Sequence, residues 1–198
     1  IGLIVNDKKV PKHVSELIAW ASGQPTIQIA GLIVVPEGDA EAGDAQAVWK
    51  LIHRLEAKRL KGSPFSGAFE HADAAVGTLS KSEAGQLDLL IQCGNAGRTD
   101  DELPHARLGV IEVCYSDDRA QRGGPPGLWE VLQKRGKTGF FIRHRDSNSD
   151  RWHVVYRGFV PTQGYSLLNR AALLTRAQRY LKLLIEGVAR SDALPTAM

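Results

Sequence analysis

The spacing of apolar and polar residues along the chain predicts an alternation of strands and helices. Residues 1–5, "IGLIV", form a short apolar run rich in β-branched side chains and followed by turn formers, which is typical of a buried strand. Residues 11–22 then repeat apolar side chains at helical spacing. Pro11 stands in the first turn of this segment and Gly23 follows its end, so we expect a helix there.

The same pattern continues to the end of the chain. Further strands are expected at 26–35, 87–93 and 108–115, and further helices at 40–60 and 125–135. Segment 61–86 is rich in Gly, Ser and Ala, which favours a loop with a short helical turn. The last part predicts a strand pair joined by a polar turn and then a long amphipathic helix, at 139–144, 152–158 and 167–189. Strand–helix alternation of this kind predicts an α/β fold with a mostly parallel sheet and helices on both faces.

Composition narrows the class of protein. The 198 residues are 43% hydrophobic and carry a formal charge of +3 without a basic tract, so we expect neither a nucleic-acid nor a membrane partner. Cys93 and Cys114 both lie in apolar runs, which indicates free thiols and a cytoplasmic protein. The 6 histidines are not at metal-ligand spacing, so no metal site is expected. The chain starts with Ile rather than Met; we expect residues 1–198 to form a single domain, with room for a C-terminal partner domain in a longer chain.

The segment "QRGGPPG" at 121–127 predicts a binding loop. Ligands of open α/β sheets bind beyond the carboxyl ends of the strands, and this segment follows the strand predicted at 108–115. Gly123 and Gly124 let the backbone approach a ligand, and Pro125 beside them restricts the chain. We therefore expect the loop to line a concave small-molecule pocket together with Asp150.

Residues 108–150 resemble the core of the formyltransferase family, whose members transfer a formyl group from 10-formyltetrahydrofolate to an amine. Arg122-Gly123 matches the family's Arg-Gly step, Trp129 its helix, Thr138-Gly139 its Thr-Gly, and Asp150 its catalytic Asp. The wording "RGGPPGLWEV" and the later Ser166 and Asn169 are closest to formyltransferase-like N-terminal domains of glycan- and glycolipid-associated proteins.

This resemblance implies a Rossmann-like formyltransferase domain with a folate donor and an amino sugar or nucleotide-linked amine as acceptor. It assigns proton handling to Asp150. It assigns ligand binding to a set of loop and strand residues: Arg122, Gly123, Gly124, Pro125 and Thr138.

Two positions depart from the family pattern. The family's Asn falls on Glu112 and its His on Cys114, so the candidate catalytic residues are Asp150, Glu112 and Cys114. In the family, Asn and protonated His stabilise the developing oxyanion, and loss of one such donor costs roughly 10²–10³ in rate. Cys114 itself is read either as a nucleophile or as a buried, unreactive thiol. We expect a degenerate member with weak or no formyl transfer that binds a small ligand or a partner domain; the alternative is an active folate-dependent enzyme.

The environment of Glu112 provides a further expectation. Strand alternation puts Val110, Glu112 and Cys114 on one face, and a buried carboxylate needs a partner. Arg122 is the expected partner, with Arg98 and His144 as weaker candidates. In the opposing interpretation, Glu112 reaches solvent and touches nothing.

Overall fold

The computed structural model describes residues 1–35, 44–60, 71–93, 104–115, 125–147 and 151–194. Within this part of the chain, six strands form one sheet in the order β3–β1–β5–β6–β7–β8. The first four strands of that order run parallel: β3 (Gly31–Val34), β1 (Gly2–Val5), β5 (Leu90–Gln92) and β6 (Val110–Cys114). β7 (Lys137–Arg145) and β8 (Trp152–Pro161) are antiparallel and form the predicted pair. The structure thus confirms the α/β class and the mostly parallel sheet.

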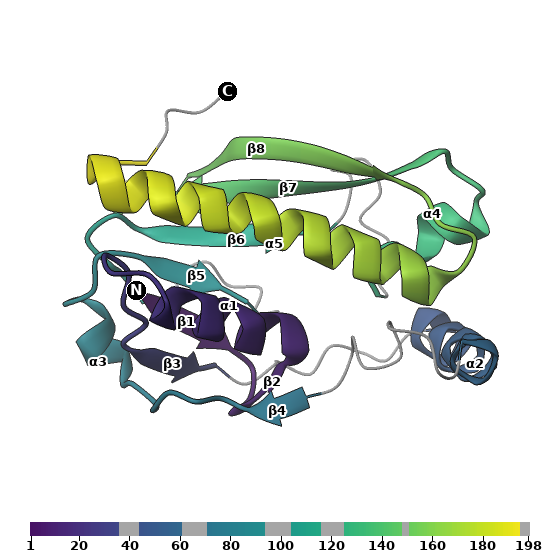
Figure 1. Ribbon diagram of the computed structural model, residues 1–198, viewed down its shortest axis with the longest axis horizontal. Helices are drawn as coiled ribbons and strands as arrows, with labels where there is room; N and C mark the ends of the chain where they lie inside the picture. The colour runs from purple at the N-terminus through teal and green to yellow at the C-terminus, as the bar shows by residue number, and fades with distance from the viewer. Residues whose placement is uncertain (36–43, 61–70, 94–103, 116–124, 148–150, 195–198) are drawn as a thin grey trace.

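The helices are α1 (Lys12–Ser22), α2 (Asp44–Arg59), α3 (Lys81–Ala84), α4 (Leu128–Leu132) and α5 (Ser166–Ser191). Figure 1 shows α1 and the long α5 side by side in front of the sheet. α3 lies on the opposite face, where Ala84 packs with Ile4, Leu90 and Val110. The described segments contain no helix that is both long enough and apolar enough to cross a membrane.

Aliphatic residues on both faces explain why the parallel strands are continuous apolar runs. Leu3, Ile91 and Ile111 point toward α1 and α5, and their neighbours Ile4, Leu90 and Val110 point to the other side. A strand covered on both faces cannot alternate apolar and polar residues, because both sides of the pleat are buried. The runs read from the sequence as buried strands therefore form the centre of the sheet.

The structure differs from the prediction near the start of the chain. β2 (Lys9–Pro11) and β4 (His71–Asp73) form a separate two-stranded antiparallel sheet. Pro11 was expected in the first turn of a helix, and it ends β2 instead, while β4 falls in the segment expected to be a loop. Every residue of β4 is exposed, so this strand has no hydrophobic pattern that a sequence reading can detect.

Candidate functional site

A cavity of about 330 Å³ lies at the carboxyl edge of the parallel strands. Residues at or just after the ends of β1, β5 and β6 border it, and α1 and α5 close its sides; these residues include Asn6, Gln92, Tyr115, His13 and Arg170. Aliphatic side chains of the two helices and of β6 supply the apolar wall: Val14, Leu17, Val113, Leu174 and Leu181. This is the location that the strand-end rule predicts for a ligand.

Burial sets the charges in this cavity. It lowers the pKa of His13 to about 4, with further lowering by the nearby Arg170 and His71, so the imidazole is neutral at pH 7. Burial also raises the pKa of the Tyr115 phenol and lowers the pKa of the Arg170 guanidinium, which Tyr115 partly offsets. The cavity therefore presents neutral hydrogen-bonding groups beside two charged ones, the Arg170 cation and the Glu112 carboxylate.

Two further polar groups, Asn6 and Cys93, border the cavity. The buried Oδ1 atom of Asn6 has no hydrogen-bond partner among the described residues, and Asn6 borders the cavity. A ligand hydroxyl or amine could satisfy this acceptor, because buried polar atoms are rarely left unpaired. Cys93 also borders the cavity, and burial raises its pKa to about 12, which keeps the thiol protonated. Cys93 is therefore a poor nucleophile.

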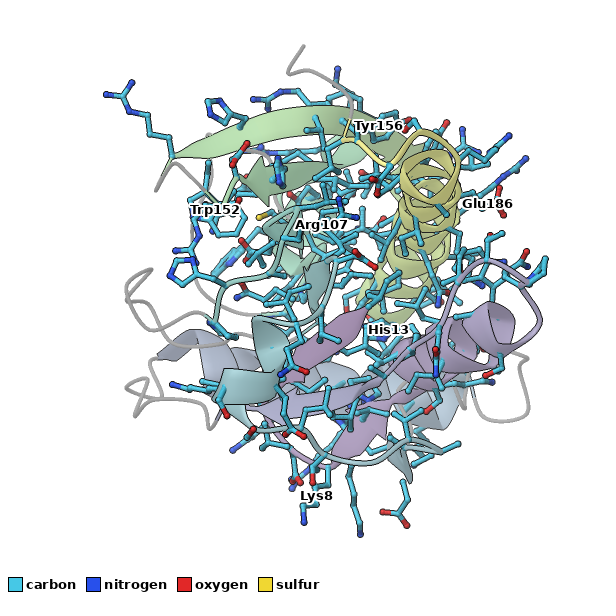
Figure 2. The ribbon with its side chains drawn as sticks, turned by 90° about the vertical axis from the view of Figure 1, so that its left-hand side faces the viewer. Lys8, His13, Arg107, Trp152, Tyr156 and Glu186 are labelled. Atoms are coloured by element: carbon cyan, nitrogen blue, oxygen red, sulfur yellow. The ribbon has the colours of Figure 1, made fainter. Side chains whose placement is uncertain are left out.

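Glu112 is held by a partner that the sequence analysis missed. Its Oε2 atom lies 2.5 Å from Nε of Arg143, and the two side chains are 18% and 31% exposed. The antiparallel register of β6 and β7 sets Arg143 directly opposite Glu112. The Arg143 guanidinium in turn lies over the ring of Trp152, 4.1 Å from its centroid. Figure 2 shows Trp152 on the side of the sheet away from α5.

The expectation that Glu112 is paired is therefore met, although by Arg143. Arg122 and Arg98 lie outside the described residues. The ring of His144 points elsewhere, because its Nε2 donates to the carbonyl of Leu108 at 2.7 Å. The interpretation of Glu112 as a free, solvated carboxylate is wrong. Cys114 ends β6 on the same face as Glu112 and is partly buried.

Thr138 is fully buried in a polar network beneath the predicted loop. Its hydroxyl accepts from Nδ2 of Asn169 at 2.9 Å and lies 2.9 Å from the hydroxyl of Thr162. Asn169 Nδ2 also donates to the carbonyl of Gly127 at 2.8 Å, and its Oδ1 accepts from the backbone of Gln163 at 3.1 Å. In this structure Asn169 holds Gly127 at the end of the loop, and the Thr138 hydroxyl, which was expected to bind ligand, is committed to Asn169 and Thr162.

The loop expected at 121–127 is described only in its last part. The carbonyl of Pro125 accepts from the backbone of Leu128 at 3.3 Å, and Pro126 borders the cavity. Gly127 has φ 77°, and a Cβ there would lie 2.7 Å from Asn169 Nδ2. Arg122, Gly123 and Gly124 lie outside the described residues, so only the Pro126 end of the loop is placed at the cavity.

Asp150 also lies outside the described residues. Its described neighbours belong to the β7–β8 hairpin, where Arg145 pairs with both Val110 and Trp152. The hydroxyl of Ser147 donates to the carbonyl of Arg107 at 3.1 Å, which ties this end of the hairpin to the segment before β6. The end of the hairpin that carries Arg145 and Trp152 therefore lies beside the start of β6. Tyr115 and the cavity lie at the opposite end of β6.

Nothing in this donor set resembles a metal centre: among the described residues, no group of three or more His, Cys, Asp or Glu side chains could hold an ion. The fit of this position to a developing formyl oxyanion is also poor. The Glu112 carboxylate can only accept hydrogen bonds, and the adjacent donor, Arg143, is engaged by Glu112 and Trp152.

Comparison with known proteins gives a consistent result for the fold. No protein-family model matches the sequence, and no curated protein matches it significantly. Among solved structures, phosphoribosylglycinamide formyltransferase from Anaplasma phagocytophilum aligns with a TM-score of 0.59 at 11% identity, covering 100% of this chain and 92% of that one. Glycinamide ribonucleotide transformylase 1 from Symbiobacterium toebii aligns with a TM-score of 0.54 at 16% identity, covering 96% and 87%.

A third solved structure, which contains bound ligands, is also similar. The N-formyltransferase from Helicobacter canadensis, in complex with folinic acid and dTDP-3-aminofucose, aligns with a TM-score of 0.51 at 10% identity. The alignment covers 98% of this chain and 64% of that one, so the chain spans less than two thirds of this relative. At these identities the similarity concerns the backbone alone. The chain has a formyltransferase-like fold.

Proposed function

We propose that this chain is a small-molecule-binding domain of formyltransferase-like fold in which formyl transfer is weak or absent. The observation that carries the proposal is the Glu112–Arg143 ion pair. By the sequence resemblance, Glu112 occupies the family's Asn position, where the reaction needs a hydrogen-bond donor to the developing oxyanion. A carboxylate there repels negative charge, and the guanidinium beside it is already neutralised.

The cavity supports the ligand-binding part of the proposal. Asn6 offers an acceptor without a partner among the described residues, Gln92 and Tyr115 add uncharged polar groups, and Arg170 and Glu112 add one charge of each sign. Aliphatic side chains form the remaining wall. Such a lining suits a ligand with hydroxyl or amine groups on a partly apolar body, of the size that a cavity of about 330 Å³ admits. Cys93 and Cys114 form no disulfide, which fits the cytoplasmic location expected from the sequence.

The alternative function is an active folate-dependent formyltransferase acting on an amino sugar or a nucleotide-linked amine. It is favoured by Asp150, which matches the family's catalytic Asp, and by the folinic acid and dTDP-3-aminofucose of the Helicobacter canadensis enzyme. Under this alternative 10-formyltetrahydrofolate is the donor, Asp150 removes the amine proton, and Arg143 would have to leave Glu112 to face the oxyanion.

A transfer assay separates the two functions. The chain is incubated with 10-formyltetrahydrofolate and dTDP-3-aminofucose, and formylated product is measured by mass spectrometry. We expect no product from the wild-type chain, and measurable product when the family residues are restored in the double variant Glu112→Asn, Cys114→His. Wild-type turnover that is lost in Asp150→Ala would establish the active enzyme instead.

Calorimetric titration with folinic acid and with dTDP tests the binding part. We expect at least one of them to bind the wild-type chain. Arg170→Met should weaken that binding, while Arg190→Met on the exposed last turn of α5 should not. Absence of binding by both probes would count against the cavity as a site for this class of ligand.

A further inference from the structure

One side of α2 is held against the start of α5. The Glu56 carboxylate accepts hydrogen bonds from the backbone of Ser166 and of Leu167, each at 2.8 Å. Trp49 lies near Arg170, with 6.0 Å between the guanidinium carbon and the ring centroid. Figure 1 shows α2 beside the start of α5 and apart from α1. These contacts fix which side of the helix faces the rest of the chain.

Burial along α2 repeats at helical spacing. From Trp49 to the end of the helix, the partly buried residues are those at positions 49, 52, 53 and 56, which lie on a single helix face. This inner face contains both Trp49 and Glu56, so it is the face that packs on α5.

A second face of α2 carries exposed leucines and basic residues. Its members follow the spacing i, i+3, i+4 and i+7 and are all exposed: Leu51, Arg54, Leu55 and Lys58. Leu51 and Leu55 are 62% and 64% exposed. This outer face, made of residues 51, 54, 55 and 58, is turned away from Glu56. Packing on α5 therefore leaves its apolar stripe uncovered.

The outer face differs from the ordinary scatter of exposed apolar side chains. Single exposed leucines are common and need no explanation. In the described part of the chain, the other exposed large apolar side chains each stand on a different element: Leu132, Phe159 and Leu183. Leu51 and Leu55 instead lie one turn apart on the same face. Such a stripe is typical of a helix that packs against another helix.

The charges on and beside the outer face are positive. Arg54 and Lys58 belong to it, and Lys50 and Arg59 lie beside it and are exposed. Among the described side chains of α2, the one acidic group is Glu56, and its carboxylate is committed to the start of α5. A basic last turn also complements the helix dipole, but Lys50 and Arg54 lie before that turn. The surface therefore suits a partner that combines acidic and apolar side chains.

We propose that the outer face of α2 binds an acidic amphipathic helix of a partner protein. Apolar side chains of that helix pack on Leu51 and Leu55, and its Asp and Glu residues face Arg54 and Lys58. Exposed ion pairs contribute little and α2 is short, so the complex is weak and salt-dependent. An anionic membrane fits less well, because two leucines give a narrower apolar face than interfacial helices use. None of the described residues that line the cavity belongs to α2, so this surface does not rest on the proposed function.

Fluorescence anisotropy with a designed peptide tests the surface. The probe is a fluorescein-labelled, hydrocarbon-stapled helix built from repeats of Glu-Leu-Glu-Ala-Leu-Glu-Ala, and the reference peptide has Lys in place of every Glu. We expect saturable binding of the acidic helix and no binding of the basic one. The double variant Leu51→Gln, Leu55→Gln should bind about tenfold more weakly or worse, since Gln keeps helix propensity but loses the apolar contact. The double variant Arg54→Gln, Lys58→Gln should bind several-fold more weakly at low salt, and this difference should shrink at 1 M salt.

Leu183→Gln, which changes an exposed leucine of α5, is the matched control and should bind the acidic helix as the wild type does. Absence of saturable binding, or equal binding by the variant of Leu51 and Leu55, would overturn the proposal. Binding to vesicles of phosphatidylserine and phosphatidylcholine, with the same loss in that variant, would replace the protein partner by a lipid surface. A concentration-dependent dimer that the variant abolishes would assign the outer face to a second copy of this chain instead.

Discussion

The two halves of the sheet are stabilised in different ways. The parallel strands β3, β1, β5 and β6 are short and are held between aliphatic clusters on both faces. The antiparallel strands β7 and β8 are longer. Specific side-chain contacts add to their stability: the Thr138–Asn169 hydrogen bonds, the Glu112–Arg143 ion pair and the stacked Tyr156–Tyr180 rings. The parallel half therefore supplies a frame that tolerates conservative apolar change, and the antiparallel half fixes the geometry around the site.

The strongest test of this contrast is at Gly109, where the halves meet. Gly109 has φ 86°, its carbonyl accepts from Leu90 of β5, and a Cβ would lie 2.0 Å from the carbonyl oxygen of Arg145 in β7. We expect Gly109→Ala to lower the free energy of unfolding by roughly 4 kcal/mol or more, because backbone strain adds to a clash with backbone atoms that cannot rotate away. Urea denaturation followed by circular dichroism measures this. Gly136→Ala, where a Cβ meets nothing within 4 Å, should change stability little. Equal losses of stability in the two variants would contradict the tight contact between β6 and β7 at Gly109, the seam between the two halves.

The next largest effect is expected at Asn169 in the antiparallel half. Asn169→Ala removes the hydrogen-bond partner of the Gly127 carbonyl and of the Gln163 amide, and it leaves the Thr138 hydroxyl with Thr162 alone. An orphaned buried group costs about 1–3 kcal/mol, and the half-buried Gln163 amide costs less, so we expect a total of about 2 kcal/mol or more. Thermal unfolding of this variant is compared with that of the control Gln163→Ala. The Gln163 side chain is partly exposed and, among the described residues, donates to the nearby Pro161 carbonyl. A decrease of less than about 1 kcal/mol in the free energy of unfolding of Asn169→Ala would show that the Asn169 hydrogen bonds do not stabilise the antiparallel half.

His13 tests the cavity side of the parallel half through pH. Its pKa is lowered to about 4, while the unfolded chain has the ordinary value near 6.5, so the unfolded state binds the proton first as pH falls. The wild type should therefore lose stability relative to His13→Gln between about pH 6.5 and pH 4, and the difference should stay constant below that range. The full shift corresponds to roughly 3 kcal/mol, and partial burial reduces it to about 2 kcal/mol. Parallel pH dependences of the two proteins would mean that His13 is not buried as described.

Much of the fold follows from sequence patterns, because burial on both faces leaves a readable signal. The runs at 1–5 and 108–115 became β1 and β6, and the apolar periodicity of 167–189 became α5. The strands β2 and β4 could not be found in this way, since β4 is wholly exposed and Val10 is the one fully buried residue of β2. A local pattern of apolar and polar residues reflects which side chains are buried. A small sheet with few buried side chains therefore leaves almost no such pattern in the sequence.

The site was predicted less completely, for a different reason. Strand alternation placed Glu112 and Cys114 on one face, and the strand-end rule placed the cavity, both from local sequence. The partner of Glu112 depends on the register between β6 and β7, a long-range property that alternation alone does not give. Thr138 was read from the family motif as a ligand-binding residue and Asn169 as part of the resemblance, and only the packing shows that they bond to each other.

The smallest predicted effect concerns the ion pair at the seam. Glu112 and Arg143 are partly exposed, so solvent screening limits their coupling to about 1 kcal/mol despite the 2.5 Å separation. A double-mutant cycle with Glu112→Gln and Arg143→Met measures this coupling, because the lost contact between Arg143 and Trp152 cancels between the two arms. The coupling should fall further at 1 M salt, where exposed charges are screened. A coupling energy near zero at low salt would remove the physical basis for a blocked oxyanion position, and it would make the active-enzyme alternative the stronger one.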